Sequence, residues 1–581
     1  MKTFLKMFFA VILAFVVMGL LGTFFIVALS SQKPKPIAKD AILEINLSGV
    51  LVDRAVDDPF SRLPMFGGGG EDIIGLNDLK DAIQAASEDD NIKGIYLELG
   101  AFQAGPALAL ELRQALDEFH STGKFIYAYG ENLFQNGLYL GTVADSIFAH
   151  PTGILELKGL SATIPFFKDM LSNIGIKPVV IRGSNNRFKS AVEPFLENEI
   201  SEANYEQTKR FLDVFWEEWL NTVSSSRDLS AEQINAWADS LEIVTVERAA
   251  EVGLIDGVIY HSGMLKMLAE KTGKDNEKPS FISHTDYLNG NRPSRDGEKR
   301  IAVVYAEGEI VTGDGDNYTI GSDRLVKTLR KLRQDDRTDA VVLRVNSPGG
   351  SVLASEAIWD EVSQIANEKT LVVSMAHLAA SGGYYISCPA DSIFVQPNTI
   401  TGSIGVFGLF FTAEELLTEK IDLHFSTVKT NPFADIMDPT REMTEFEQRV
   451  VQREIDGIYG RFLHRVSTGR GLDSLYVDSI AQGRVWAGKD AIRLGLADAE
   501  GGLEDAILAA ASIQGLGDDY KVVEYKQLRT FEEMIAEAFG GPSATYMDLK
   551  FGKLAPYIRT LESISRREGI QARLENDLII R

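Results

Sequence analysis

The sequence predicts an α/β fold, formed by two copies of one domain that follow a single N-terminal transmembrane helix. Three observations lead to this prediction: an internal repeat, an alternation of strand and helix patterns, and a long uncharged segment near the N-terminus. The chain has 581 residues, which is more than one hydrophobic core usually supports, so at least two domains are expected.

Matching segments reveal the internal repeat. Their offsets are 246 (335 − 89), 246 (390 − 144) and 242 (495 − 253). Three matches in the same order at nearly constant spacing indicate a diverged duplication. The matched segments are 89–97 (DDNIKGIYL) and 335–343 (DDRTDAVVL), 144–148 and 390–394 (both ADSIF), and 253–256 (GLID) and 495–498 (GLAD).

Strand and helix patterns alternate along the second copy. Residues 340–345 form a short apolar run rich in β-branched side chains, and a Gly/Pro turn follows at 346–350. Residues 351–369 have helical periodicity, and 371–375 and 392–395 are further apolar runs typical of buried strands. Such repeats predict a mostly parallel sheet covered by helices.

The N-terminal segment 7–29 is predicted to be a membrane anchor. It contains 23 residues without a charge, enough at about 1.5 Å per residue to cross a hydrocarbon core roughly 30 Å thick. A cleaved signal peptide is the alternative, but its apolar region is usually only about 7–15 residues long. In either case we expect the rest of the chain to be exported.

Composition excludes several classes of function. The formal net charge is −25, which argues against a nucleic-acid-binding protein, because such proteins carry a basic surface. Cys388 is the single cysteine, so neither an internal disulfide nor a multi-cysteine metal site is possible. The seven histidines include no HExxH pair. We therefore expect no metal and no organic cofactor.

Ser381 is the candidate nucleophile. It follows a predicted buried strand and opens a helix, and Gly382 and Gly383 come next. The backbone N–H groups of Gly382 and of Gly350, in the turn 346–350, are candidates for an oxyanion hole, in which loss of one donor typically costs about 3–4 kcal/mol. The alternative is that Ser381 is only a helix N-cap.

The two copies differ at these positions, which favours catalysis over capping. The position 246 residues before Ser381 is Gln135, and the turn at 347–351 corresponds to 101–105 (AFQAG). The first copy therefore lacks both the serine and the glycine turn, although its ADSIF segment is retained. A serine needed only for stability would be expected in both copies.

A serine nucleophile needs a general base, and Lys189 is the candidate. The second copy, aligned on Pro439, has Ala434 or Asp435 at the equivalent position. The first copy thus retains a lysine and lacks the serine, and the second copy shows the reverse. A solvated surface lysine and a base role for His377, four residues before Ser381, are the alternatives.

Taken together, these motifs resemble the long form of signal peptide peptidase A, a bacterial membrane-anchored protease of the Ser/Lys class. The resemblance extends from the anchor to about residue 505. Its motifs are 189–195 (KSAVEPF), 346–352 (NSPGGSV), 381–384 (SGGY) and 401–406 (TGSIGV).

The resemblance implies a ClpP/crotonase-like fold and a Ser/Lys dyad drawn from both halves of the chain. Ser381 would be the nucleophile, Lys189 the general base, and Ser403 would orient the lysine amine. It also implies a homotetramer in the inner membrane, with its catalytic domains on the periplasmic side. The expected substrates are signal peptides left in the membrane and similar hydrophobic peptides.

The expected domain boundaries follow from the repeat and the anchor. A polar, Pro- and Asn-containing stretch separates the two copies and is interpreted as a linker. The segments are a cytoplasmic N-terminus at 1–6, the anchor at 7–29, the first repeat at 40–272, the linker at 273–299, the second repeat at 300–540, and a tail of unknown role at 541–581.

Two other classes of function remain open at this stage. A crotonase-type acyl-CoA enzyme would also use paired backbone N–H groups as an oxyanion hole, but it would need neither a serine nucleophile nor a distant lysine. A membrane-bound scaffold would use the duplicated domains only to assemble a ring.

Overall fold

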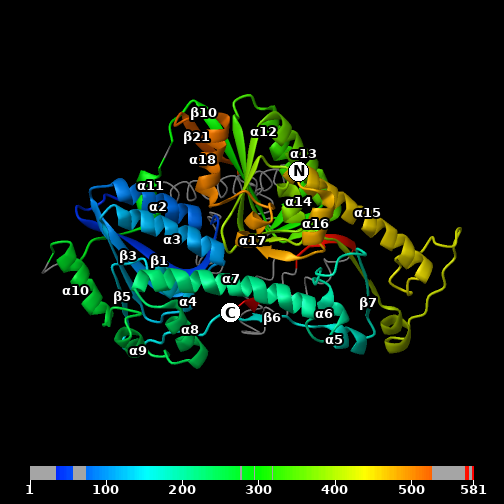
Figure 1. Ribbon diagram of the computed structural model, residues 1–581, viewed down its shortest axis with the longest axis horizontal. Helices are drawn as coiled ribbons and strands as arrows, with labels where there is room; N and C mark the ends of the chain where they lie inside the picture. Colours follow the sequence, from blue (N-terminus) through cyan, green and yellow to red (C-terminus); the bar gives the residue numbers. More distant parts are fainter. Residues whose placement is uncertain are drawn as a thin grey trace, which may run out of the picture. The chain divides into compact units, whose positions relative to one another are not determined.

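The computed structural model describes residues 35–55, 73–274, 278–293, 295–316, 318–525, 569–574 and 579–580 (Figure 1). The expected anchor at 7–29 and the segment 1–6 lie outside these residues, as does most of the tail at 541–581. Within the described ranges, no helix has both the length and the apolar character needed to cross a bilayer.

The chain forms two compact units. Unit 1 consists of Met1–Gln103, Leu112–Leu155 and Thr245–Pro293. Unit 2 consists of Ala104–Glu111, Glu156–Val244 and Ser294–Arg581. Unit 2 thus includes a long segment, Glu156–Val244, that the repeat places in the first copy.

Unit 1 is built around a parallel sheet in the order β2-β1-β3-β4-β5-β8, with β9 also paired to β1. Its strands are β1 (Ala41–Val52), β2 (Ile73–Gly75), β3 (Ile92–Gln103), β4 (Phe125–Gly130), β5 (Ser146–Ala149), β8 (Gly257–Val258) and β9 (Phe281–Ser283). Its helices are α2 (Leu76–Glu88), α3 (Pro106–Ser121, from Leu112 onward), α4 (Gln135–Gly141), α9 (Val246–Glu251), α10 (His261–Lys271) and α11 (His284–Asn291).

Unit 2 contains the corresponding sheet, in the order β19-β17-β15-β13-β10-β21, with β16 paired to β15 and β20. Its strands are β10 (Lys299–Glu307), β13 (Ala340–Ser347), β15 (Thr370–Ala380), β16 (Ser392–Val395), β17 (Ile400–Gly402), β19 (Val485–Ala487), β20 (Ala499–Glu500) and β21 (Tyr520–Tyr525). The helices around it are α12 (Ser322–Gln334), α13 (Val352–Glu368), α14 (Gly382–Ser387), α15 (Glu445–Arg470), α16 (Ser474–Ile480), α17 (Gly488–Arg493) and α18 (Leu503–Gln514).

Helices cover both faces of this sheet. Figure 1 shows α18 on one side of the strands and α12 and α13 on the other. One apolar cluster joins α12, α13, α14 and α15 to the sheet, and a separate cluster joins α18 to the opposite face. Strands buried on both faces read as continuous apolar runs, which explains the pattern at Ala340–Ser347.

A second sheet of unit 2 brings distant segments together. Its order is β12-β11-β14-β22-β18-β7. The strands are β7 (Lys177–Arg182), β11 (Glu309–Val311), β12 (Thr319–Gly321), β14 (Gly349–Ser351), β18 (Phe407–Thr412) and β22 (Gly569–Arg573). Strand β7 pairs antiparallel with β18, so the segment that carries Lys189 is joined to the second copy by a strand ladder.

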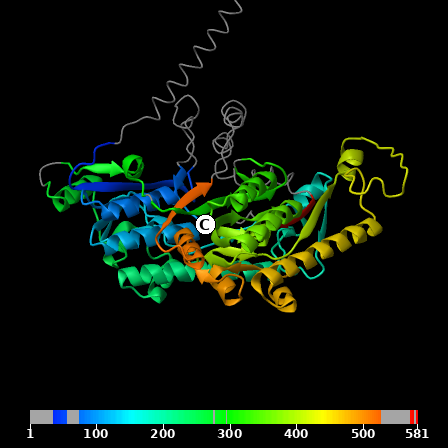
Figure 2. The same ribbon diagram turned by 90° about the horizontal axis from the view of Figure 1, so that it is seen from above.

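The rest of Glu156–Val244 is mainly helical. Its elements are β6 (Ala162–Thr163), which pairs with β23 (Ile579–Ile580), α5 (Lys168–Asn173), α6 (Glu193–Leu196), α7 (Glu202–Arg227) and α8 (Ala231–Ser240). A further segment, 413–444, contains a short π-helix (Leu416–Lys420) and precedes α15. Figure 2 shows this segment, in yellow, beyond the start of α15.

The duplication is confirmed by equivalent elements in the two units. Helices α2 and α12 begin 246 residues apart (322 − 76), as do strands β5 and β16 (392 − 146). Helices α9 and α17 begin 242 residues apart (488 − 246). The element spacing therefore reproduces the offsets of the sequence repeat.

The repeated ADSIF segment has a structural role in both units. Asp391 accepts a hydrogen bond from the backbone N–H of Leu371 at 2.8 Å, where β15 begins. Asp145 accepts the equivalent bond from Ile126 at 2.8 Å, where β4 begins. These carboxylates accept hydrogen bonds from backbone N–H groups that would otherwise have no partner at the strand ends. This role explains why the segment is retained in both copies.

The elements expected in the second copy are present with small shifts. The helix expected at 351–369 is α13 (Val352–Glu368), and the strand expected at 371–375 extends over Thr370–Ala380. The stretch 273–299, interpreted as a linker, contains β9 and α11. Strand β9 pairs with β1 and Tyr287 of α11 is buried. Despite its polar composition, this stretch therefore contains folded elements of unit 1 and is more than a linker.

Candidate active site

Ser381 lies at a sharp bend between strand β15 and helix α14. Its backbone has φ 54° and ψ −111°, a conformation that side-chain-bearing residues rarely adopt. The Ser381 N–H donates to the carbonyl of Gly402 at 2.8 Å, and its side chain makes no capping bond to the helix. The structure therefore contradicts the N-cap alternative, and the hydroxyl is directed elsewhere.

Lys189 lies directly against this hydroxyl. The Lys189 Nζ lies 2.8 Å from Ser381 Oγ, and it is also within hydrogen-bond distance of Ser403 Oγ at 2.9 Å and of the Ser403 carbonyl at 3.0 Å. All three residues belong to unit 2. The structure therefore brings together the serine, the lysine and the second serine that the sequence singled out, although 192 residues separate the first two.

Burial controls the charge of this lysine. The Lys189 side chain is 1% exposed, and desolvation lowers its pKa well below the usual value. A neutral amine can accept a proton, which an ammonium group cannot. The three oxygen partners and the low pKa together suit a general base in contact with a serine hydroxyl.

Gly483 has no side chain, so the backbone of Lys189 can lie close to it. A Cβ at Gly483 would lie 2.6 Å from Lys189 Cβ and 2.7 Å from the Lys189 backbone nitrogen. Gly483 also has φ +80°, a conformation suited to glycine. The neighbouring Phe188 N–H donates to the Gln482 carbonyl at 2.9 Å, so this turn fixes the lysine segment against the second copy.

Helix α7 holds the lysine segment from the other side. The Gln207 amide donates to Ser190 Oγ at 2.9 Å and to the Phe188 carbonyl at 3.2 Å, and its oxygen accepts from the Val485 N–H at 3.1 Å. Glu193 accepts a hydrogen bond from Ser201 Oγ at 2.6 Å, and Ser201 is the N-cap residue of α7. Much of the KSAVEPF motif thus serves to position Lys189.

The expected oxyanion donors lie close to Ser381 in the fold. Gly349 has φ +94°, and a Cβ there would lie 2.6 Å from the backbone nitrogen of Gly382. Gly350 belongs to β14, beside that glycine. The Gly382 N–H opens α14, where backbone N–H groups have no partner within the helix, so it is available to an acyl oxygen.

The two other candidate groups near the serine do not contact it. His377 is partly buried, desolvation lowers its pKa to about 4, and its Nδ1 has no hydrogen-bond partner among the described residues. Burial raises the pKa of the Cys388 thiol to about 12, so that group stays protonated. Lys189 is the basic side chain that contacts Ser381 Oγ in the described structure.

Sequence reasoning missed three groups of the site. Gln207 and Gly483 position the lysine, and the Gly405 carbonyl accepts from Ser381 Oγ at 3.4 Å. Gly405 stands in the quoted TGSIGV motif and Gly483 in a Gln-Gly-Arg turn, so both lay in glycine-containing turns. No local sequence pattern marks Gln207, because its role depends on where α7 packs.

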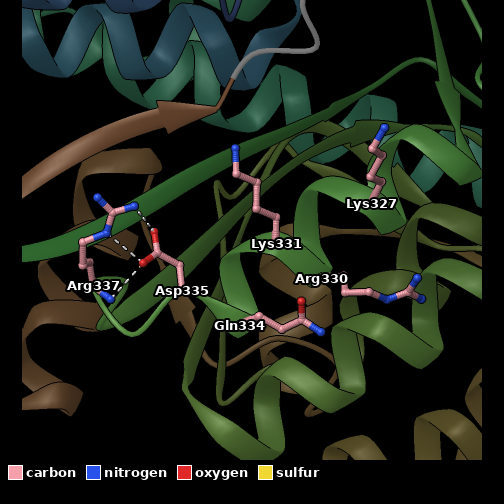
Figure 3. Close-up of a pocket in the computed structure, with 6 residues that line it drawn as sticks. All are labelled: Lys327, Arg330, Lys331, Gln334, Asp335 and Arg337. Carbon is pink, nitrogen blue, oxygen red and sulfur yellow. Dashed lines mark hydrogen bonds and ion pairs between the residues drawn. The ribbon is translucent and has the colours of Figure 1, made fainter.

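A separate surface hollow of about 450 Å³ is lined by α12 and the turn after it. Figure 3 shows Arg337 turned toward Asp335 there, while Lys327 and Lys331 extend from the helix. The lining contains no candidate nucleophile, and Arg330 pairs with Glu361 at 3.0 Å. The hollow therefore has no part in the chemistry at Ser381.

Comparison with known proteins defines the class of this site. A model of the Clp protease family matches residues 296–401, the part of unit 2 that contains β14 and Ser381. Together with one family match in each copy, described next, it defines the duplicated ClpP-like α/β fold, and the relatives define the class as serine proteases.

The particular family follows from the remaining matches. The model of peptidase family S49 matches residues 118–274 and 363–517, one segment in each copy. The chain is 35% identical to Protease 4 of Haemophilus influenzae over 516 residues, 85% of this chain and 82% of that protein. It is 35% identical to Protease 4 of Salmonella typhi over 87% of this chain and 83% of that protein.

A plant relative extends the same similarity. The chain is 30% identical to the chloroplastic serine protease SPPA of Arabidopsis thaliana, over 86% of this chain and 74% of that protein. The chain belongs to peptidase family S49 and is a serine protease. The resemblance to the long form of signal peptide peptidase A is confirmed.

Proposed function

We propose that the chain is a membrane-tethered serine endopeptidase that uses a Ser/Lys dyad, with Ser381 as nucleophile and Lys189 as general base. The observation that carries the proposal is the 2.8 Å contact between Lys189 Nζ and Ser381 Oγ. The lysine is buried and its pKa is lowered, as a base working near neutral pH requires.

In the proposed reaction, Ser381 Oγ attacks a peptide carbonyl while Lys189 takes the hydroxyl proton. The N–H groups of Gly350 and Gly382 stabilise the negative charge on the carbonyl oxygen. Lys189 then gives the proton to the departing amine, and an ester on Ser381 remains. Water hydrolyses that ester with Lys189 again acting as base, while Ser403 holds the amine in position.

The proposed substrates are hydrophobic peptides at the membrane, such as signal peptides after their release from secreted proteins. Two features support this part. The uncharged segment 7–29 is long enough to span a bilayer, and we place it in the inner membrane. The Arabidopsis relative is the chloroplastic serine protease SPPA. The catalytic domains would then lie on the periplasmic side.

The proposed assembly is a homotetramer. Segment 413–444 supports an oligomer because it exposes large apolar side chains, which commonly mark protein or membrane contacts. Val428 is 99% exposed. The other exposed apolar residues of this segment are Ile421, Leu423, Phe425, Phe433 and Met437.

The experiment that tests the dyad compares peptide hydrolysis by the full chain in detergent with that of Ser381→Ala and Lys189→Ala. Both variants should fold and assemble but lose turnover. A fluorophosphonate probe should label wild-type Ser381 and leave Ser381→Ala unlabelled. An active Lys189→Ala variant would place the general base elsewhere, and an unlabelled, inactive wild type would favour a scaffold.

A further inference from the structure

Ser347 is a buried serine beside the active site that the proposed reaction does not use. It is the last residue of β13, and its side chain is 0% exposed. The glycine turn that contains the oxyanion candidate Gly350 follows it directly. A buried hydroxyl without a hydrogen-bond partner destabilises the fold, so the partners of Ser347 show what this residue holds in place.

The Ser347 hydroxyl joins two backbone segments. Ser347 Oγ donates to the Gly308 carbonyl at 2.6 Å, and it accepts from the Gly349 N–H at 3.2 Å. Gly308 lies between β10 and β11, and its N–H donates to the Asn346 carbonyl at 2.9 Å. The hydroxyl therefore ties the glycine turn to the end of the neighbouring strand β10.

The glycine turn needs such a restraint, because glycine backbones have many accessible conformations. Gly349 has φ +94°, and a Cβ there would lie 2.6 Å from the Gly382 nitrogen, so the turn lies against the start of α14. Oxyanion donors act when they are held about 2.7–3.1 Å from the position of the acyl oxygen. A group that fixes Gly349 therefore also fixes the neighbouring Gly350 N–H.

The backbone of Ser347 contacts the nucleophile helix as well. A Cβ at Gly383 would lie 2.7 Å from the Ser347 carbonyl oxygen and 3.2 Å from Ser347 Cβ. Gly383 belongs to the first turn of α14, directly after Gly382. Ser347 thus lies between the two candidate sources of oxyanion N–H groups, bonded to one and packed against the other.

The duplication separates what the fold needs from what the site needs. Strand pairs 46 with 98 and 305 with 344 align the two copies, and they make Gly49 the counterpart of Gly308, since 308 − 49 equals 305 − 46. The counterpart of Ser347 is Ala101 (347 − 246). Both copies therefore keep the glycine, whereas the hydroxyl occurs only in the copy that contains Ser381.

We propose that Ser347 is a positioning residue of the oxyanion hole, whose hydroxyl holds the glycine turn so that the Gly350 N–H faces the acyl oxygen. The inference rests on the proposed function, because it concerns acyl transfer at Ser381. Ser347 acts through the turn and takes no part in proton transfer. Without its hydroxyl the fold is kept, as it is around Ala101, while the charged tetrahedral intermediate loses stabilisation.

Peptide hydrolysis by Ser347→Ala, with the full chain in detergent, tests the inference. Its kcat should fall roughly 10–100-fold, less than the roughly 10²–10³-fold of a deleted donor, while KM changes by less than about twofold. Inhibition by a peptide aldehyde, whose adduct with Ser381 carries the same oxyanion, should weaken by a similar factor. Ser347→Cys, which keeps the size but is a weak hydrogen-bond donor, should show the same losses.

Ser387→Ala is the matched control. Ser387 is also 0% exposed, and its hydroxyl donates to a backbone carbonyl, that of Gly383, at 2.7 Å. This variant should keep the wild-type kcat and aldehyde inhibition. The pH profile of kcat/KM should be the same in Ser347→Ala as in the wild type, because the contacts of Lys189 are untouched.

The outcomes separate this inference from the proposed function. Unchanged kcat and unchanged aldehyde inhibition in folded Ser347→Ala would overturn the positioning role and leave the dyad standing. A raised KM at unchanged kcat would contradict it too, because that pattern marks substrate binding. An equal loss in Ser387→Ala would mean that any buried serine near α14 has this effect. A wild type that hydrolyses no peptide would overturn both proposals.

Discussion

At the scale of single residues, the site depends on the burial of Lys189 away from solvent. Desolvation is the cause of the lowered pKa of Lys189, and its three oxygen partners are two hydroxyls and a carbonyl. None of these partners carries a charge, so none stabilises the ammonium form as a carboxylate would. The same burial that suits the amine to the proposed role of base also costs folding free energy.

Activity should rise with pH through the lowered pKa of Lys189, because the neutral amine is the reactive form. Replacing the lysine by alanine should reduce kcat/KM roughly 10²–10⁴-fold, the usual contribution of a general base. A pH profile of kcat/KM for both proteins checks this. A wild-type profile that rises and levels off near about 6.5, the usual histidine pKa, would contradict a lysine base.

The free energy of unfolding should rise with pH for the same reason. Below about 10.4 the unfolded chain protonates this lysine, whereas the folded chain holds it neutral down to its lowered pKa. The unfolded state thus binds more protons between the two pKa values, so stability increases with pH across that window. Lys189→Met should raise stability at pH 7 and flatten this rise.

Urea denaturation at pH 7 and pH 9 measures the effect. Lys266→Met is the matched control, because the Lys266 side chain is 74% exposed and its replacement should leave the pH dependence unchanged. A variant Lys189→Met with the same pH dependence as wild type would mean that the lysine is charged in the folded chain.

At the scale of elements, the site is assembled by turns that carry no catalytic group themselves. The turn containing Gly483 contacts the Lys189 backbone, and α7 holds the same segment through Gln207. Both contacts join Glu156–Val244 to the second copy. Small displacements of these elements would move the amine away from Ser381 Oγ.

Gly483→Ala should therefore reduce activity at least tenfold, because its Cβ would lie 2.6 Å from Lys189 Cβ. Gly471→Ala is the matched control: Gly471 has φ +63°, and a Cβ there would meet nothing within 4 Å. Both changes carry roughly 1–2 kcal/mol of backbone strain. Peptide hydrolysis, measured at equal concentrations of folded protein, tests this prediction. An equal loss of activity in both variants would mean that backbone strain alone causes the loss.

A buried ion pair supports the central strand of unit 2. Arg344 of β13 donates to Glu111 at 2.6 Å, and their side chains are 0% and 1% exposed. Glu111→Ala leaves a buried arginine without its carboxylate, which typically costs about 3–5 kcal/mol. Chemical denaturation measures this loss, and Glu270→Ala, which removes an exposed pair, should change stability by less than about 1 kcal/mol.

At the scale of the whole molecule, the two copies supply different residues of the candidate site. Each copy has kept the elements and the aspartates that pair with its strand ends, whereas the turn with Ser381 occurs in the second copy and the segment with Lys189 in the first. Unit 2 collects both groups, because Glu156–Val244 packs with the second copy. One half of the duplication could therefore lose the serine without loss of its fold.

The exposed apolar segment 413–444 should take part in assembly. Val428→Glu should lower the molar mass in detergent, measured by light scattering after size exclusion, because a charge would be buried in the contact. Leu475→Glu is the control, since Leu475 is 81% exposed but lies on α16. An unchanged mass for Val428→Glu would remove this segment from the interface.

The sequence alone was enough to predict the fold class and the duplication and to single out Ser381 and Lys189, whereas Ser403 was named only through the resemblance to a known family. Apolar periodicity and repeated motifs are local signals, and they survive in a single chain. The tertiary structure was needed to give the distances among these side chains, the positioning roles of Gln207 and Gly483, and the folded elements within 273–299. The pairing of β22 with β14 and β18 also needed the tertiary structure, because pairing between strands far apart in sequence depends on backbone hydrogen bonds, which leave no pattern in the side chains.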